Sequence, residues 1–306
     1  MMDLPVSVIG GYLGAGKTTL INHLLRHNEG QRLAVLVNEF GELPIDADLI
    51  EATGDGLISI SGGCVCCAFG SDLIGALSDI QNMSPRPDHI LIEASGVALP
   101  ASIATTVGMI DGLRADATLV LADAEQIRRN ANNTYLADTI ERQLKQADIL
   151  LLTKADLVSP HQLEAVRDWL NQNYPGKRIL PVTSGQIPIS AALGALPFPA
   201  RRSAVADTVH GRFHSQVYRP ASHIDAKDLG AALADDPGVD RAKGFIRTAT
   251  GMALIHVVGN RYTIETVDDD HETGVVFIGL KDQLDLENIQ RILEGLEAGN
   301  QEQAHV

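Results

Sequence analysis

The stretch Gly11-Tyr-Leu-Gly-Ala-Gly-Lys-Thr18 decides the fold that the sequence predicts. It follows the apolar run at residues 6–10 and leads into an amphipathic run at residues 19–25. The pattern G-x-x-x-x-G-K-[ST] between a strand and a helix is typical of a phosphate-binding loop (P-loop). Its glycines let backbone N–H groups surround phosphate oxygens at the positive end of a helix. We therefore expect Lys17 to contact the β- and γ-phosphates of a nucleotide and Thr18 to bind Mg²⁺.

A glycine turn that merely contains a lysine is the alternative interpretation of this stretch. The order of strand, loop and helix disfavours it. The residues predicted to contact the nucleotide here are Gly11, Gly14, Ala15, Gly16, Lys17, Thr18 and Thr19.

Around the P-loop, short apolar runs alternate with helical patterns up to about residue 184. This alternation predicts parallel strands joined by crossover helices, which is a doubly wound α/β sheet. Most of the runs are continuously apolar, as strands buried on both faces are. The predicted strands cover residues 6–9, 33–37, 57–60, 90–92, 117–121, 149–152 and 178–182. The predicted helices cover residues 18–27, 72–81, 127–147 and 160–173.

The sequence predicts two domains. A P-loop domain at residues 1–195 is followed by a linker at residues 196–208, where two prolines and paired arginines interrupt the pattern. Residues 209–306 are predicted to form a smaller α+β domain with a mainly antiparallel sheet. Its predicted strands cover residues 214–219, 243–249, 253–258, 262–266 and 275–280, and its helices cover residues 226–234 and 286–296.

The composition excludes several classes of partner. Of the 306 residues, 45% are hydrophobic and 21% are charged, which is ordinary for a globular protein. The net charge of −15 makes nucleic acid and anionic membranes unfavourable partners. No run approaches the ~20 apolar residues that cross a bilayer, and the N-terminus lacks a basic region and cleavage site. We therefore expect a cytoplasmic protein without a membrane or nucleic-acid partner.

A second nucleotide motif is predicted at the end of the strand at residues 90–92. Glu93-Ala-Ser-Gly96 follows it, as a Walker-B-like strand requires to place a carboxylate beside Mg²⁺ and the hydrolytic water. Glu93 is therefore expected to be catalytic together with Lys17. The alternative is a solvated glutamate at a strand end.

The base of the nucleotide is predicted from Thr153-Lys154-Ala155-Asp156, which resembles the guanine motif [NTS]-K-x-D. A carboxylate at Asp156 accepts hydrogen bonds from the N1–H and amine of guanine, a pattern that adenine lacks. GTP is therefore favoured over ATP, with Lys154 and Asp156 as contacts. A plain helix start is the alternative. Thr183, after the next strand, lies where a further base-contacting loop is expected.

The three cysteines of the chain, Cys64, Cys66 and Cys67, lie within four positions after two glycines. Thiolates are soft ligands that suit Zn²⁺, Co²⁺, Ni²⁺ or Cu⁺. Three cysteines do not complete a tetrahedron, and the open fourth position suits a transferable metal better than a structural one. Buried apolar thiols and a redox pair are the alternatives.

Together these motifs resemble the CobW-like GTPases, which are related to the hydrogenase and urease nickel-insertion GTPases. The resemblance also rests on Asn38-Glu-Phe-Gly-Glu42 with Asp46, and on Lys243-Gly-Phe-Ile246 followed by the strand near residues 254–258. It covers nearly the whole chain, with five motifs in the family's order. It implies a metallochaperone with slow GTPase activity, a cysteine cluster that binds the cargo ion, and a client metalloprotein.

The resemblance implies further residue roles. Glu39 and Glu42 belong to a mobile switch segment, with Glu39 among the catalytic residues and Glu42 adding an oxygen ligand to the cargo site. Position 37 is Val where some relatives have an acidic residue, and the chain has no histidine-rich tract. The full ligand set therefore stays open.

The switch segment and the cysteine loop follow strands of the predicted P-loop sheet, so their tips are expected to converge over the γ-phosphate. Our hypothesis is that GTP organises the thiolate site and that hydrolysis loosens it for delivery of Zn²⁺ or Co²⁺. A metal store or sensor with a purely structural nucleotide, and a P-loop kinase of a small metabolite, are the alternatives. Whether the chain forms a homodimer stays open.

Overall fold

The computed structural model describes residues 2–38, 58–62, 71–194 and 212–303. The chain divides into two compact units, Met1–Ile189 and Ser190–Val306. The predicted linker at residues 196–208 lies outside the described residues. No helix in the described ranges has the length and apolar character needed to cross a bilayer.

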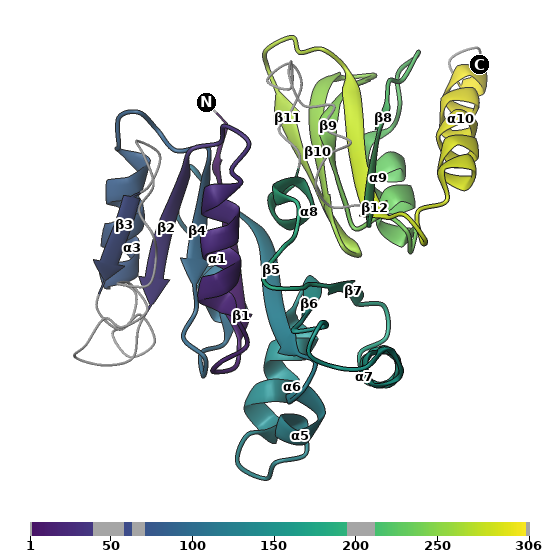
Figure 1. Cartoon of the computed structure of the whole chain (residues 1–306). Helices are drawn as coiled ribbons and strands as arrows, with labels where there is room; N and C mark the ends of the chain where they lie inside the picture. The colour runs from purple at the N-terminus through teal and green to yellow at the C-terminus, as the bar shows by residue number, and fades with distance from the viewer. Residues whose placement is uncertain (1, 39–57, 63–70, 195–211, 304–306) are drawn as a thin grey trace. The chain divides into compact units, whose positions relative to one another are not determined.

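The first unit is built on a parallel sheet of seven strands in the order β3-β2-β4-β1-β5-β6-β7 (Figure 1). Every predicted strand of this sheet is present, which confirms the predicted doubly wound fold. The P-loop follows the central strand β1, so it leaves the sheet where the direction of winding reverses, as ligand sites of such sheets do. The strands are β1 (Leu4–Gly11), β2 (Leu33–Asn38), β3 (Ile58–Gly62), β4 (His89–Glu93), β5 (Leu113–Asp123), β6 (Ile149–Thr153) and β7 (Arg178–Pro181).

Helices cover both faces of this sheet. In Figure 1, α1 lies in front of the sheet and α3 behind it. Apolar side chains of α3 and α4 share one buried cluster with β1, β2 and β4, and those of α5, α6 and α7 share another with β5 and β6. The helices are α1 (Lys17–Arg26), α3 (Ser71–Gln81), α4 (Pro100–Val107), α5 (Ile127–Ala131), α6 (Ala137–Gln146) and α7 (Pro160–Asn173).

One predicted helix is wrong, because residues 127–147 form two helices, α5 and α6. Asn132 Nδ2 donates to Arg128 O at 2.9 Å, and the side-chain Oδ1 of Asn133 accepts from Tyr135 N at 2.9 Å. Asparagine side chains compete in this way with the hydrogen bonds of a helix, so the two adjacent asparagines interrupt it.

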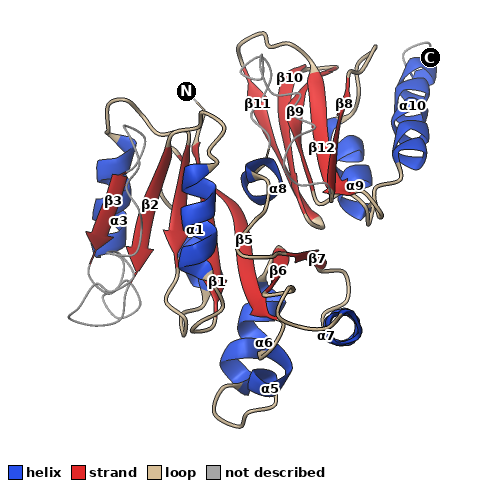
Figure 2. Ribbon diagram, viewed as in Figure 1, coloured by secondary structure: helices blue, strands red, loops and turns tan. Residues whose placement is uncertain are grey.

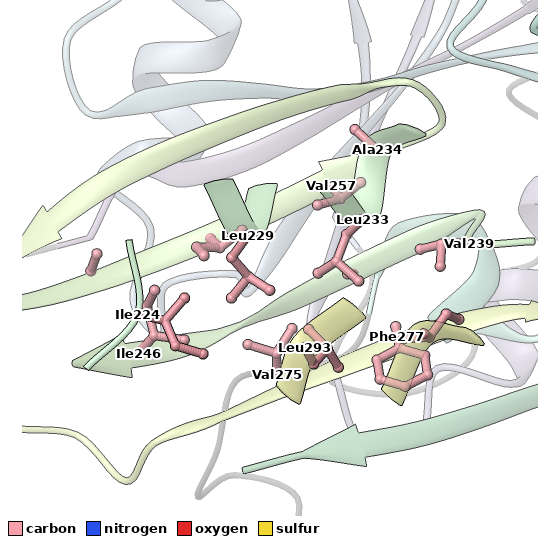
Figure 3. Packing of buried hydrophobic residues seen from close by; sticks show 14 of the residues in the cluster. Ile224, Leu229, Leu233, Ala234, Val239, Ile246, Val257, Val275, Phe277 and Leu293 are labelled. Atoms are coloured by element: carbon pink, nitrogen blue, oxygen red, sulfur yellow. The ribbon is translucent and has the colours of Figure 1, made fainter. Parts of the chain in front are cut away.

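The second unit is an antiparallel sheet of five strands in the order β11-β10-β9-β12-β8, with helices α9 and α10 (Figure 2). This confirms the predicted α+β class of the C-terminal part. Leu229 and Leu233 of α9 and Leu293 of α10 belong to the same buried cluster as Val275 and Phe277 of β12 (Figure 3). The elements are β8 (Phe213–Tyr218), α9 (Ala226–Asp235), β9 (Arg241–Thr248), β10 (Gly251–Val258), β11 (Arg261–Val267), β12 (Gly274–Leu280) and α10 (Leu286–Gln303).

A buried arginine ties helix α8 (Ile189–Leu193) to β9. The side chain of Arg241 is only 2% exposed; its Nε donates to Ala191 O at 2.9 Å and its Nη2 donates to Ala192 O. These carbonyls lie in the last turn of α8, where backbone oxygens lack helical partners. The buried guanidinium thus supplies donors to a helix end.

Candidate nucleotide and metal site

Glycines give the P-loop its conformation. Gly11, Gly14 and Gly16 have φ of 130°, 73° and 96°. Residues with a Cβ rarely adopt such positive φ angles. Gly16 is the N-cap of α1, and the Ala15 N–H donates to Tyr12 O at 3.1 Å to close the turn. The loop therefore has the backbone that the phosphate-binding pattern predicts, and the N-terminus of α1 points into it.

Lys17, Thr18 and Glu93 lie together at the carboxyl end of β1 and β4. Lys17 is 8% exposed, and its Nζ donates to Gly11 O at 3.1 Å and to Tyr12 O at 3.5 Å. The Thr18 hydroxyl donates to Glu93 Oε1 at 3.3 Å, and Glu93 is 2% exposed. Glu93 is opposite Ile9 in the register of β4 on β1. A hydroxyl and a carboxylate are hard oxygen donors of the kind that Mg²⁺ prefers, so this pair fits the ion.

The segment after Glu93 returns to the P-loop at Gly96. A Cβ on Gly96 would lie 2.6 Å from Leu13 Cδ2 and 2.8 Å from the Leu13 backbone N. Such distances are shorter than van der Waals contact, so only glycine fits at this approach. The Walker-B-like segment and the phosphate loop are therefore in direct contact.

The predicted guanine motif is joined to the P-loop by a hydrogen bond. Thr153 Oγ1 donates to Ala15 O at 2.8 Å, and Thr153 is 4% exposed. Lys154 has φ of 56°, in the left-handed region that costs a non-glycine residue about 1–2 kcal/mol. Its Nζ donates to Asp123 Oδ2 at 2.7 Å. Asp156, the residue predicted to contact the base, is exposed to solvent.

Asp123 is a residue of this site to which sequence reasoning assigned no role. It ends β5 and is only 7% exposed. Its pairing with Lys154 orients the lysine of the guanine motif. Its position at the end of an apolar strand next to β6 was the one available signal.

The loop after β7 also reaches the P-loop helix. Thr183 and Gln186 form a β-bridge, and a Cβ on Gly185 would lie 3.0 Å from the carbonyl carbon and oxygen of Thr19. One ring nitrogen of His23, Nε2, is 3.1 Å from Ile187 O, and His23 is 8% exposed. Thr183 therefore lies in a loop packed on α1, near the residues predicted to contact phosphate.

Five predicted site residues lie outside the described residues: Glu39, Glu42, Cys64, Cys66 and Cys67. The strands that lead to them are described, and their last residues, Asn38 and Gly62, are opposite each other in the register of β2 on β3. Val37 is opposite Glu93. At the ~4.8 Å spacing of neighbouring strands, β3 ends about 14 Å from β1 in the plane of the sheet.

The described part of the chain holds no group of three or more His, Cys, Asp or Glu residues placed to bind a metal ion. A cargo site built from described residues alone is therefore not present. The three cysteines remain the predicted ligands. The switch segment and the cysteine loop both begin at the carboxyl ends of their strands, on the side of the sheet where β1 leads to Lys17.

Comparisons with known proteins give the family. The family model "CobW/HypB/UreG, nucleotide-binding domain" matches residues 5–181, and the model "Cobalamin synthesis protein cobW C-terminal domain" matches residues 213–297. The chain is 30% identical over 280 residues to the zinc chaperone CobW of Sinorhizobium sp, covering 79% of this chain and 78% of that protein. It is 34% identical over 300 residues to the zinc chaperone YeiR of Escherichia coli K12, covering 85% and 88%.

Among solved structures, the Zn(II)-bound YjiA GTPase from E. coli aligns with a TM-score of 0.47 at 24% identity, covering 97% of this chain and 99% of that one. The two family matches and the curated relatives confirm the resemblance that the motifs predicted. The chain belongs to the CobW/HypB/UreG family and carries the CobW-type C-terminal domain as well.

Proposed function

We propose that this chain is a GTP-hydrolysing metallochaperone that binds zinc and delivers it to a client protein in a nucleotide-dependent way. The observation that carries the proposal is that three loops meet at the carboxyl ends of the parallel strands. Thr153 of the guanine motif bonds to the P-loop, Gly96 packs on the P-loop, and Thr18 bonds to Glu93. The strands that lead to the cysteine loop and the switch segment end at that same edge.

The described residues support distinct roles in GTP binding and hydrolysis. Asp156 reads guanine through its two acceptor oxygens. Lys17, now bonded to P-loop carbonyls, supplies positive charge to the β- and γ-phosphates. Thr18 and Glu93 would hold Mg²⁺, which would supply positive charge against the negative charge of the phosphates. Glu93 and Glu39 are proposed to orient the attacking water.

The cargo metal is proposed to bind at Cys64, Cys66 and Cys67, with Glu42 as an oxygen ligand. Thiolates suit Zn²⁺ and also Co²⁺. The relatives named zinc chaperones favour zinc. β3 ends about 14 Å from β1, and the five residues that follow Gly62, up to Cys67, would be long enough to reach the end of β1, at about 3.4 Å for each extended residue.

The test measures zinc affinity by competition with a chromophoric chelator, with Mg²⁺ and either a non-hydrolysable GTP analogue or GDP. The proposal expects tighter zinc binding with the GTP analogue, because γ-phosphate contacts order the segments that carry the ligands. Equal zinc affinities with the GTP analogue and with GDP would contradict the proposed coupling between nucleotide and metal binding.

Two further assays separate the alternatives. If Lys17→Ala delivers zinc to apo-client as well as the wild type, the chain is a metal store in which nucleotide is only structural. GTP hydrolysis in the absence of any small-molecule acceptor separates a GTPase from a kinase.

A further inference from the structure

The buried side chain of Gln143 contacts the loop that follows Glu93. Gln143 lies on α6 and is only 1% exposed. Its Nε2 donates to Gly96 O at 3.1 Å and to Ala98 O at 2.7 Å. Both hydrogens of the Gln143 amide group are thus donated to two carbonyl oxygens of the same loop.

This position is otherwise suited to an apolar residue. The α6 neighbours Ile140 and Leu144 are each 1% exposed and belong to the buried cluster that α6 forms with β5 and β6. Burying an amide costs free energy unless its donors are paired, so a glutamine here is favourable only if the loop presents its carbonyls at these places.

The loop held by Gln143 is the one that approaches the P-loop. Ala94 N donates to Ile9 O at 2.8 Å at its start, and Ala98 N donates to Ser95 O at 2.9 Å across it. Gly96, between these bonds, lies against the Leu13 backbone. Gln143 therefore fixes the part of the loop that backbone bonds to the sheet do not reach.

We propose that Gln143 is a positioning residue that holds residues 96–98 where they sense the γ-phosphate, and so sets the preference for GTP over GDP. This inference rests on the proposed GTPase function. Gly96 lies against Leu13 of the phosphate loop, and the loop follows Glu93, the proposed Mg²⁺ ligand. On the proposed function this puts the loop beside the terminal phosphate, which GDP lacks. Losing the Gln143 hydrogen bonds therefore weakens GTP binding selectively.

The test uses Gln143→Met, which keeps the side-chain length and removes both donors. Dissociation constants of fluorescent GDP and of a fluorescent non-hydrolysable GTP analogue are measured with Mg²⁺ for the full-length chain. The ratio of the GTP-analogue constant to the GDP constant is expected to rise about tenfold, the scale of losing one or two neutral hydrogen bonds. A purely structural role would weaken both nucleotides equally and leave the ratio unchanged.

The matched control is Ser7→Ala, which also removes buried hydrogen bonds in the first unit. Ser7 Oγ is 2.9 Å from His89 Nε2 and 3.4 Å from Asp116 Oδ2, near the amino ends of β4 and β5. Ser7→Ala should lower the melting temperature without changing the ratio of the two nucleotide dissociation constants. If Gln143→Met does not fold, Gln143→Asn, which keeps the amide but shortens its reach, is expected to change the ratio in the same direction.

The outcomes separate the two proposals. A wild-type chain that does not hydrolyse GTP overturns the proposed function. If the wild type hydrolyses GTP, the role of Gln143 alone is overturned in two cases: when the wild type binds both nucleotides equally, or when Gln143→Met has the same ratio as the wild type.

Discussion

The contact between Gly96 and Leu13 predicts a large effect from one added methyl group. In Gly96→Ala the new Cβ would lie 2.8 Å from the Leu13 backbone N, whereas nonbonded separations are about 3.5 Å or more. The exposed Leu13 side chain turns aside readily, but its backbone N does not, so the two segments must separate by roughly 0.7 Å. Overpacking of this kind costs about 1–3 kcal/mol.

That separation falls between the phosphate loop and the segment that carries Glu93. A displacement of about 1 Å beside reacting groups lowers rates by up to about 100-fold. We expect single-turnover GTP hydrolysis by Gly96→Ala to fall about 10- to 100-fold, measured as phosphate release with enzyme in excess. The melting temperature should fall by about 2–12 °C, since a cost of about 1–3 kcal/mol corresponds to roughly 2–4 °C for each kcal/mol in a domain of this size.

The control for this prediction is Gly75→Ala on α3. A Cβ on Gly75 meets no atom within 4 Å, so the substitution adds helix propensity of about 1 kcal/mol and no clash. It should hydrolyse GTP at the wild-type rate with an equal or higher melting temperature. Hydrolysis by Gly96→Ala at the wild-type rate would refute the argument that this close approach positions the catalytic segment.

Three other predictions follow from separate parts of the molecule. Asp156→Asn should lower GTP affinity at least about tenfold and raise that for xanthosine triphosphate, whose base presents an oxygen where guanine has an amine; competition binding that still favours GTP contradicts it. Cys66→Ser should weaken zinc binding by about tenfold or more in a chelator competition, and unchanged affinity moves the cargo site elsewhere. Arg241→Met should destabilise the second unit by about 3 kcal/mol in denaturant titrations, because the carbonyls of Ala191 and Ala192 lose charged donors, and a shift below about 1 kcal/mol would show that water replaces them.

The strands and the P-loop were predictable because their signals are local. An apolar run buried on both faces is recognisable from its own residues, and a G-x-x-x-x-G-K-[ST] loop carries its geometry in its glycines. Helix α4 was missed because its eight residues, PASIATTV, form a short pattern with β-branched residues. The single helix predicted across residues 127–147 was wrong because Asn132 and Asn133 form local side-chain hydrogen bonds that periodicity does not register.

Contacts between distant segments were not predictable in the same way. The pairing of Lys154 with Asp123, the approach of Gly185 to Thr19, and the bonds of Gln143 join residues 31 to 166 positions apart. They depend on which strands are neighbours in the sheet, which a single sequence does not state. The roles of Glu39, Glu42 and the three cysteines stay predictions, since they lie outside the described residues.

The hydrogen bond from Thr153 to Ala15 has a consequence for redesigning the nucleotide preference of this protein. Because one hydroxyl links the predicted guanine motif to the phosphate-binding loop, we expect a change at Thr153 to affect base recognition and phosphate binding together. A variant designed to accept a modified purine without a change in phosphate binding is therefore better made at Asp156, which is exposed to solvent.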